Sequence, residues 1–231
     1  MTSLRLRGLA LLCTAVALPA CVRAIGQPAA DQALIAQIDR ADNHRETSLA
    51  GYTVDERYTI TNSHFSTPAV ALVKVTYTRD AGKHYEVLSR TGPSLLSSKL
   101  LNSMISEEQK LSQNPSRSLA QITSANYAMT HTGSEPLNNR PCEVLTVAPL
   151  RSSAYVLNGR IWVDAKSKQI VRIDGVPPVS PSFFASKPRI VRDYEDVGGF
   201  PLATHSHATS SGFFAGSTVV DIDYTNYKIT R

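Results

Sequence analysis

Residues 159–175, GRIWVDAKSKQIVRIDG, contain two short strands and the turn that joins them. Apolar residues occupy every second position on each side of the turn: Ile161 and Val163 before it, Val171 and Ile173 after it. The intervening charged residues are Arg160, Asp164, Arg172 and Asp174. Because successive side chains of a strand point to opposite faces, one face of this hairpin is dry and the other is charged. The pattern is typical of an antiparallel sheet that is wet on one side.

Two positions depart from this regular alternation. Trp162 falls on the charged side of its strand, where we expect its ring to stack on Arg160 or Arg172. In 217–229 the apolar phase shifts after Tyr224, and a β-bulge near Thr225-Asn226 would explain the shift.

The same period of two recurs along most of the chain. Turn signals such as Asp80-Ala81-Gly82 separate the alternating segments. We predict ten strands, at 52–61, 69–79, 84–89, 126–132, 142–148, 155–164, 169–175, 188–195, 201–209 and 217–229.

Two segments have helical spacing instead. Residues 31–41 carry one apolar stripe, and Asp31 can cap the helix. Residues 94–112 carry a longer stripe before Asn114-Pro115, which should stop the helix. We interpret this second stripe as a core-packing face rather than a cofactor or membrane surface. Its members are Leu96, Leu100, Leu101, Met104, Ile105 and Leu111.

Both helices come early, so they do not alternate one by one with the strands, as they would in a doubly wound α/β fold. We therefore predict an α+β fold: a strongly curved antiparallel sheet, or incomplete β-barrel, of about ten or eleven strands. Two or more helices should plug its concave face. Any space that the helices leave unfilled becomes an apolar groove.

The runs GRIWVDAKSKQIVRIDG (159–175), RDYEDVGGFPLATHSHATS (192–210) and STVVDIDYTNYKI (217–229) resemble bacterial lipoprotein-sorting proteins of the LolA/LolB-like superfamily. The resemblance covers roughly residues 120–231 and implies an incomplete barrel of about eleven strands, with helices at its opening, that houses acyl chains or related apolar ligands. Members of the superfamily include carriers, outer-membrane receptors and envelope-stress regulators. No ligand-contacting residue can be carried over, because no site motif of the family matches clearly.

Four of the six phenylalanines lie in turn-rich segments, 180–187 (SPSFFASK) and 211–217 (SGFFAGS). Each segment follows an alternate strand, so both should lie at the same end of the sheet. Four such side chains are costly to leave in water, so they either tuck under the sheet or line the mouth of the groove. The ligand-binding residues that we predict are Phe183, Phe184, Phe213 and Phe214, together with Leu100 and Met104 of the helix.

The N-terminus has the features of a signal peptide. Arg5 and Arg7 precede a short apolar run, 8–20, and Leu18-Pro19-Ala20-Cys21 resembles a lipobox, in which the cysteine receives the lipid. Cleavage after Ala24 without lipidation is the alternative. We predict a signal peptide at 1–20, a tether at 21–30 and one domain at 31–231, located in the periplasm or cell envelope. Lipid on Cys21 would anchor it to the outer membrane.

Removing residues 1–20 lowers the formal net charge from +5 to +3, since two arginines leave with them. Lys and Arg are scattered, which disfavours nucleic acid as a partner. If Cys21 is lipidated, Cys142 has no partner and should be buried in a strand. If Cys21 is unmodified and retained, a Cys21–Cys142 disulfide is the alternative.

Several acid and histidine pairs are candidates for reactive sites. His205 and His207 share one side of a strand but make an incomplete metal site, and a third ligand would have to come from His131 or an acid. Asp221 and Asp223 read as a solvent-facing pair. Glu107 and Glu108 are likewise expected to face solvent on the helix. We therefore predict no catalytic residues, no metal and no cofactor.

These observations favour a non-enzymatic, exported protein that binds a lipid or an acylated polypeptide in a half-barrel groove. One alternative is an envelope-stress sensor that binds a protein partner, with its groove filled by its own side chains. A less favoured alternative is an extracytoplasmic hydrolase that uses His205 and His207 with an acid.

Overall fold

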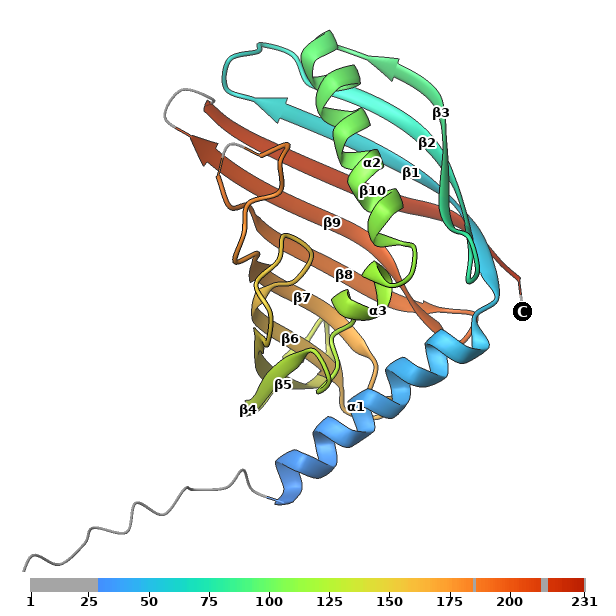
Figure 1. Cartoon of the computed structure of the whole chain (residues 1–231), viewed down its shortest axis with the longest axis vertical. Helices are drawn as coiled ribbons and strands as arrows, with labels where there is room; N and C mark the ends of the chain where they lie inside the picture. Colours follow the sequence, from blue (N-terminus) through green and yellow to red (C-terminus); the bar gives the residue numbers. More distant parts are fainter. Residues whose placement is uncertain (1–28, 185, 213–215, 231) are drawn as a thin grey trace, which may run out of the picture.

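Ten antiparallel strands form one curved sheet in the computed structural model, which describes residues 29–184, 186–212 and 216–230 (Figure 1). Along the sheet the order is β3-β2-β1-β10-β9-β8-β7-β6-β5-β4, so β3 and β4 are the two edges and the barrel is incomplete. The predicted α+β class and the ten strands are confirmed. The strands are β1 (Gly51–Asn62), β2 (Ala69–Thr78), β3 (Gly82–Thr91), β4 (Tyr127–Leu137), β5 (Arg140–Pro149), β6 (Asn158–Asp164), β7 (Ile170–Val176), β8 (Arg189–Val197), β9 (Phe200–Gly212) and β10 (Gly216–Thr230).

The helices occupy the concave side and one end of the sheet (Figure 1). Helix α1 (Ala29–Ser48) is longer than predicted and crosses one end of the strands. The helix predicted at 94–112 begins as a π-helical segment, η1 (Leu95–Leu100), and continues as α2 (Leu101–Leu111) over the concave face. A short third helix, α3 (Ser116–Ala120), was not predicted.

Two separate hydrophobic cores follow from this placement. On the α2 side, Leu96, Leu101 and Met104 pack against buried residues of β1, β2, β9 and β10. On the α1 side, Ile38 packs into a cluster that includes Leu145 and also draws on β4, β6 and β7. The two apolar stripes therefore act as core-packing faces, as the helical spacing predicted.

Strand β10 carries the predicted bulge. Thr53 of β1 pairs with Lys228, whereas Asp55 pairs with Thr225, so two residues of β10 oppose one of β1. One of the two, Asn226, has φ 58°, a left-handed conformation that asparagine tolerates better than most residues.

A second bulge corrects the prediction for Val171. Trp162 pairs with Arg172 but Val163 pairs with Ile170, so Val171 is the extra residue and turns to the opposite face. There it packs beside Trp162 and the buried Cys142 in a small outer core. Cys142 is therefore a buried strand residue, as predicted.

Trp162 also stacks as expected. The guanidinium carbon of Arg160 lies 4.8 Å from the centre of the indole ring. The indole Nε1 donates a hydrogen bond of 2.6 Å to Glu135, which gives the ring a polar partner on the outer face.

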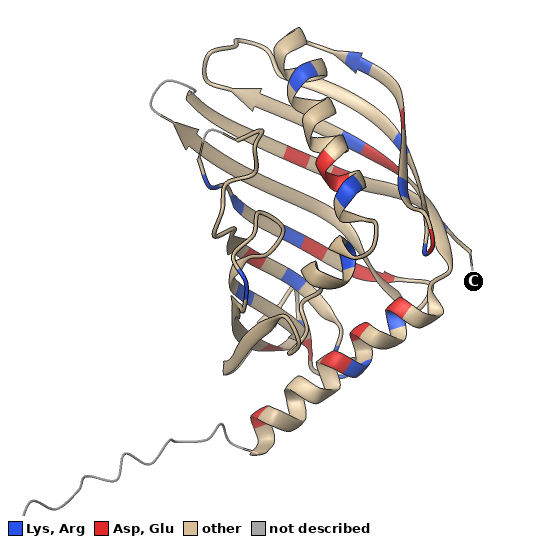
Figure 2. Ribbon diagram, viewed as in Figure 1, with Lys and Arg blue, Asp and Glu red and all other residues tan. Residues whose placement is uncertain are grey.

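Charged residues are distributed over the strands and helices in the view of Figure 2, and Lys and Arg do not gather into one patch. This agrees with the scattered basic residues in the sequence. Among the described residues, none of the helices has both the length and the apolar character needed to cross a bilayer.

Candidate ligand-binding cavity

The concave face carries a cavity of approximately 440 Å³ between α2, residues 180–184 and the strands. Its volume lies within the range of small-molecule sites, about 300–1,000 Å³. Most of the lining is apolar, and the lining residues come from six strands, α2 and two connecting segments. The apolar lining residues are Tyr58, Met104, Leu111, Leu157, Ile173, Phe183, Phe184, Ile190, Ala208, Val220 and Ile222.

A smaller cavity of approximately 200 Å³ adjoins the first beneath α1. Ile38 and Ala41 of α1 form part of its wall. The two cavities have six lining residues in common, so the hollow continues along the concave face from the α2 side to the α1 side. The shared residues are Leu111, Tyr155, Leu157, Ile173, Arg192 and Tyr194.

Three of the predicted ligand-binding residues lie at the main cavity. Phe183 and Phe184 have ring centres 4.9 Å apart and line it together with Met104 of α2. Leu100 instead packs against the α2-side core, outside the cavity lining. Two of the predicted residues, Phe213 and Phe214, lie outside the described residues, as does Cys21, the predicted lipidation site.

The segment that carries Phe183 and Phe184 is held against the end of β9. The hydroxyl groups of Ser186 and Ser210 are 3.0 Å apart, and the backbone N–H of Ser211 donates to the Ser186 hydroxyl at 3.2 Å. These contacts hold the first phenylalanine segment beside the C-terminal end of β9.

One wall of the cavity carries charges that bridge α2 to the sheet. The Lys83 ammonium on β3 donates to Glu108 of α2 at 3.3 Å. From the other side, the Arg192 guanidinium on β8 reaches the second oxygen of Glu108 at 3.5 Å. Burial opposes ionisation of Glu108, but the two cations outweigh it and lower the pKa of this carboxyl to about 2.

Glu56 lies deeper in the same wall and is almost fully buried. The Tyr58 hydroxyl donates a hydrogen bond of 2.6 Å to its carboxyl group. Burial, only partly offset by Lys83 and this hydrogen bond, raises the pKa of Glu56. Nearby, the buried hydroxyl of Tyr85 has no hydrogen-bond partner among the described residues.

Glu107 and Glu108 were predicted to face open solvent, and both instead line the cavity. Glu108 follows Met104 by four residues and precedes Leu111 by three, so helical spacing places it on the same face as these two cavity residues. Glu56 carried a similar signal, as a charged residue among the apolar positions of its strand. Lys83 and Arg192 had no comparable signal, because their convergence depends on the curvature of the sheet.

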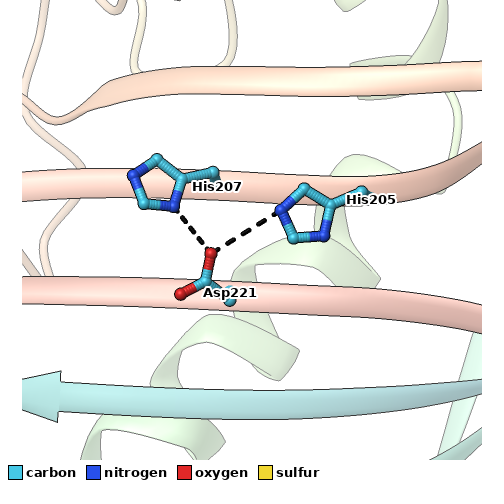
Figure 3. A group of neighbouring side chains, drawn as sticks. All are labelled: His205, His207 and Asp221. Atoms are coloured by element: carbon cyan, nitrogen blue, oxygen red, sulfur yellow. Dashed lines mark hydrogen bonds and ion pairs between the residues drawn. The ribbon is translucent and has the colours of Figure 1, made fainter.

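The opposite face of the sheet carries a histidine cluster (Figure 3). His205 and His207 of β9 and Asp221 of β10 place ligand atoms within 4.8 Å of one another. The acid therefore supplies the third group that the sequence left open. His131 lies elsewhere, on β4, where it contacts Glu143 at 2.9 Å.

Solved structures share this architecture, whereas no protein-family model and no curated protein sequence matches the chain. A domain described as an outer membrane lipoprotein-sorting protein, from Vibrio parahaemolyticus, has a TM-score of 0.50 at 11% identity, covering 84% of this chain and 91% of that one. The LolA superfamily protein NE2245 from Nitrosomonas europaea has a TM-score of 0.47 at 12% identity, over 87% and 94%. A DUF1329 family protein from Desulfovibrio piger has a TM-score of 0.47 at 13% identity, over 86% and 92%. The chain has a LolA-like fold, as its sequence resemblance implied.

Proposed function

We propose that this protein binds the acyl chain of a lipid or of an acylated polypeptide in the cavity on the concave face of its sheet. The observation that carries the proposal is the 440 Å³ cavity with a mainly apolar lining. Apolar surface of this extent gains free energy when a hydrocarbon chain displaces water from it, about 25 cal/mol for each Å² buried. The description of the Vibrio parahaemolyticus neighbour as lipoprotein-sorting agrees with such a ligand.

The charged wall favours an amphipathic ligand over a plain hydrocarbon. Lys83 and Arg192 share one carboxylate, Glu108, at 3.3 and 3.5 Å, distances that are long for charge-assisted hydrogen bonds. Polar atoms of a ligand can therefore gain hydrogen bonds here, and the unpartnered Tyr85 hydroxyl offers one more. The acyl chain would lie along Phe183 and the apolar strands, with its polar end toward this wall.

The proposed role is to bind a ligand, without catalysing a reaction. It places the protein outside the cytoplasm, in agreement with the predicted signal peptide. Lipid on Cys21 would hold it at the outer membrane and suit a receptor or sensor better than a shuttling carrier. Incorporation of radiolabelled palmitate, abolished in Cys21→Ser, is expected if Cys21 is the anchor; undiminished labelling of that variant would contradict it.

Native mass spectrometry of the full-length protein purified from membranes tests the ligand. We expect a bound lipid in the wild type and its loss in Ala208→Phe, because Ala208 lines the cavity and a phenyl ring there fills part of it. The matched control is Ala148→Phe, which adds the same ring at an exposed position of β5.

Protein that is consistently empty would reject the proposal and favour a sensor that binds a protein partner. Equal lipid occupancy of wild type and Ala208→Phe would place the lipid outside this cavity and would reject the site.

A further inference from the structure

The histidine cluster lies on the convex face, away from the lipid cavity. His207 pairs directly across the strands with Asp221, and His205 pairs with Asp223. Their neighbours in sequence, such as Ser206 and Ile222, line the cavity on the other face, so these four side chains point outward. The cluster is therefore built on two long, hydrogen-bonded strands rather than on loops.

The spacing of the ligand atoms suits a tetrahedral metal ion. The Nδ1 atom of His207 lies 2.6 Å from Asp221 Oδ1, and the Nε2 atom of His205 lies 3.6 Å from the same oxygen (Figure 3). Atoms bound at about 2.0–2.1 Å to one tetrahedral ion are roughly 3.3 Å apart. Side-chain rotations that lengthen the His207–Asp221 distance and shorten the His205–Asp221 distance, each by less than roughly 1 Å, would bring both distances to that spacing.

Asp223 gives His205 the orientation that a metal ligand needs. The Nδ1 atom of His205 lies 2.9 Å from the carboxylate of Asp223. A proton on Nδ1 satisfies this contact and leaves the lone pair of Nε2 directed toward Asp221. Metal-bound histidines commonly have such a carboxylate on their second nitrogen, where it fixes the tautomer and raises ligand basicity.

Charges of both signs surround the imidazoles, since Arg57 of β1 pairs across the strands with Asp223. Asp193 of β8 pairs across the strands with His205, but its carboxylate is held by Arg172. Asp221 and Asp223 remain as the acidic groups next to the imidazoles, and both contact histidine nitrogens in the described structure.

From this geometry we propose that His205, His207 and Asp221 form a binding site for a divalent transition-metal ion, with Zn²⁺ as the natural probe. Two nitrogens and one carboxylate oxygen form a ligand set that Zn²⁺ accepts, and the fourth position stays open to water. The site is independent of the lipid proposal, since it shares no residue with the cavity lining.

Isothermal titration of the full chain with Zn²⁺ at pH 7.5, after removal of any histidine tag, tests the site. At this pH free histidines are largely neutral and able to bind metal. We expect one ion per chain. Asp223→Asn should weaken binding roughly 10–100-fold, the usual loss when a group behind the ligand is removed. His207→Ala, which deletes a ligand, should weaken it further.

Two control variants separate a built site from general attraction of the ion. His84→Ala removes an exposed histidine on β3, far from the cluster in sequence, and should leave affinity unchanged. Asp193→Asn removes a nearby charge without touching the ligands and should have a smaller effect than Asp223→Asn. Absence of zinc binding by the wild type, or equal affinity of wild type and His207→Ala, would overturn the proposal. Zinc binding by Ala208→Phe equal to that of the wild type would show that the metal site does not depend on the lipid cavity.

Discussion

The two halves of the concave face are built differently, although a helix is packed against each. On the α1 side, Ile38 meets a hydrophobic cluster in which Leu145 and Ile161 are fully buried, and the charged pair Asp42–Arg45 of α1 lies beside it at the smaller cavity. On the α2 side, Leu101 is packed as tightly, yet about two turns later Glu108 reaches across the concave face to cations on two strands. The hollow of 440 Å³ lies on this second side.

The difference separates stability from binding. Apolar packing stabilises the fold with little desolvation cost, whereas each buried charge loses hydration that its partners only partly return. The buried Glu56, whose pKa is raised by burial, is therefore a poor way to stabilise a sheet, whereas the partly exposed Glu108 is compensated by its two cations. Perturbed carboxyl groups in a cleft are typical of functional sites. The hydrophobic cluster under α1 supplies much of the scaffold, and the larger part of the hollow, on the α2 side, is available to a ligand.

The largest expected effect is that of Leu145→Ala on the packed side. The change leaves a cavity in a dry core and should lower the free energy of unfolding by about 2–5 kcal/mol. Met104→Ala on the α2 side should cost less than Leu145→Ala, because Met104 already borders open space. Urea titrations followed by circular dichroism measure both. Equal losses would mean that the two halves are packed alike.

The second effect is that of Glu108→Gln, which leaves Lys83 and Arg192 without their shared counter-charge. We expect a loss of roughly 1–2 kcal/mol in the free energy of unfolding at pH 7, the lower part of the range for an unsatisfied buried polar group, because the three side chains keep 19–31% of their exposure. The matched control is Glu107→Gln, one residue earlier; Glu107 also lines the cavity, but its carboxylate contacts Lys110 of the same helix and Tyr155 instead of two cations of the sheet. That variant should lose less than about 1 kcal/mol. A control that loses as much as Glu108→Gln would contradict an inward-facing network.

The pH dependence of this effect has a defined direction. Because the pKa of Glu108 is lowered to about 2 in the folded protein, the unfolded chain binds its proton more readily. The contribution of Glu108 is therefore complete above its ordinary pKa near 4.5 and is lost as the pH falls toward 2. The stability difference between wild type and Glu108→Gln should shrink over this interval, and a difference that is constant with pH would oppose the assignment.

The strands were predictable because the alternation of apolar and polar residues can be read within each short segment of the sequence. Ten strands and the bulge at Asn226 follow from alternation alone, since a phase shift in the pattern must be absorbed by an extra residue. The bulge at Val171 escaped prediction because Ile170 and Val171 are both apolar, so no phase shift marks it.

The site was less predictable than the sheet. Phe183 and Met104 could be predicted as cavity residues, but Lys83, Glu108 and Arg192 meet only when a curved sheet brings β3 and β8 around α2.

The variant Glu56→Gln tests whether the buried charge of Glu56 lowers the free energy of unfolding. Burial raises the pKa of Glu56, so the folded protein holds this proton more tightly than the unfolded chain. Its stabilising contribution is complete below pH 4.5 and is lost as the pH rises through the raised value. The amide can still accept the hydrogen bond from Tyr58. Thermal unfolding should show Glu56→Gln more stable than wild type at pH 8, with the gain vanishing at pH 4; a loss at pH 8 would show that the carboxylate is needed.

The smallest effect is expected on the convex face behind the α1 side, where the charged residue Arg160 should raise the free energy of unfolding instead of lowering it. Arg160 is exposed and its guanidinium carbon lies 4.8 Å from the centre of the Trp162 ring. Exposed cation–π pairs contribute about 0.5–1 kcal/mol, so Arg160→Ala should lower the free energy of unfolding by that amount. Trp162 is the single tryptophan, so its fluorescence in a urea titration reports unfolding and local environment together. Arg160→Lys keeps a cation and should recover part of the loss. An unchanged midpoint and emission in Arg160→Ala would show that the ring is held by Glu135 and the outer core alone.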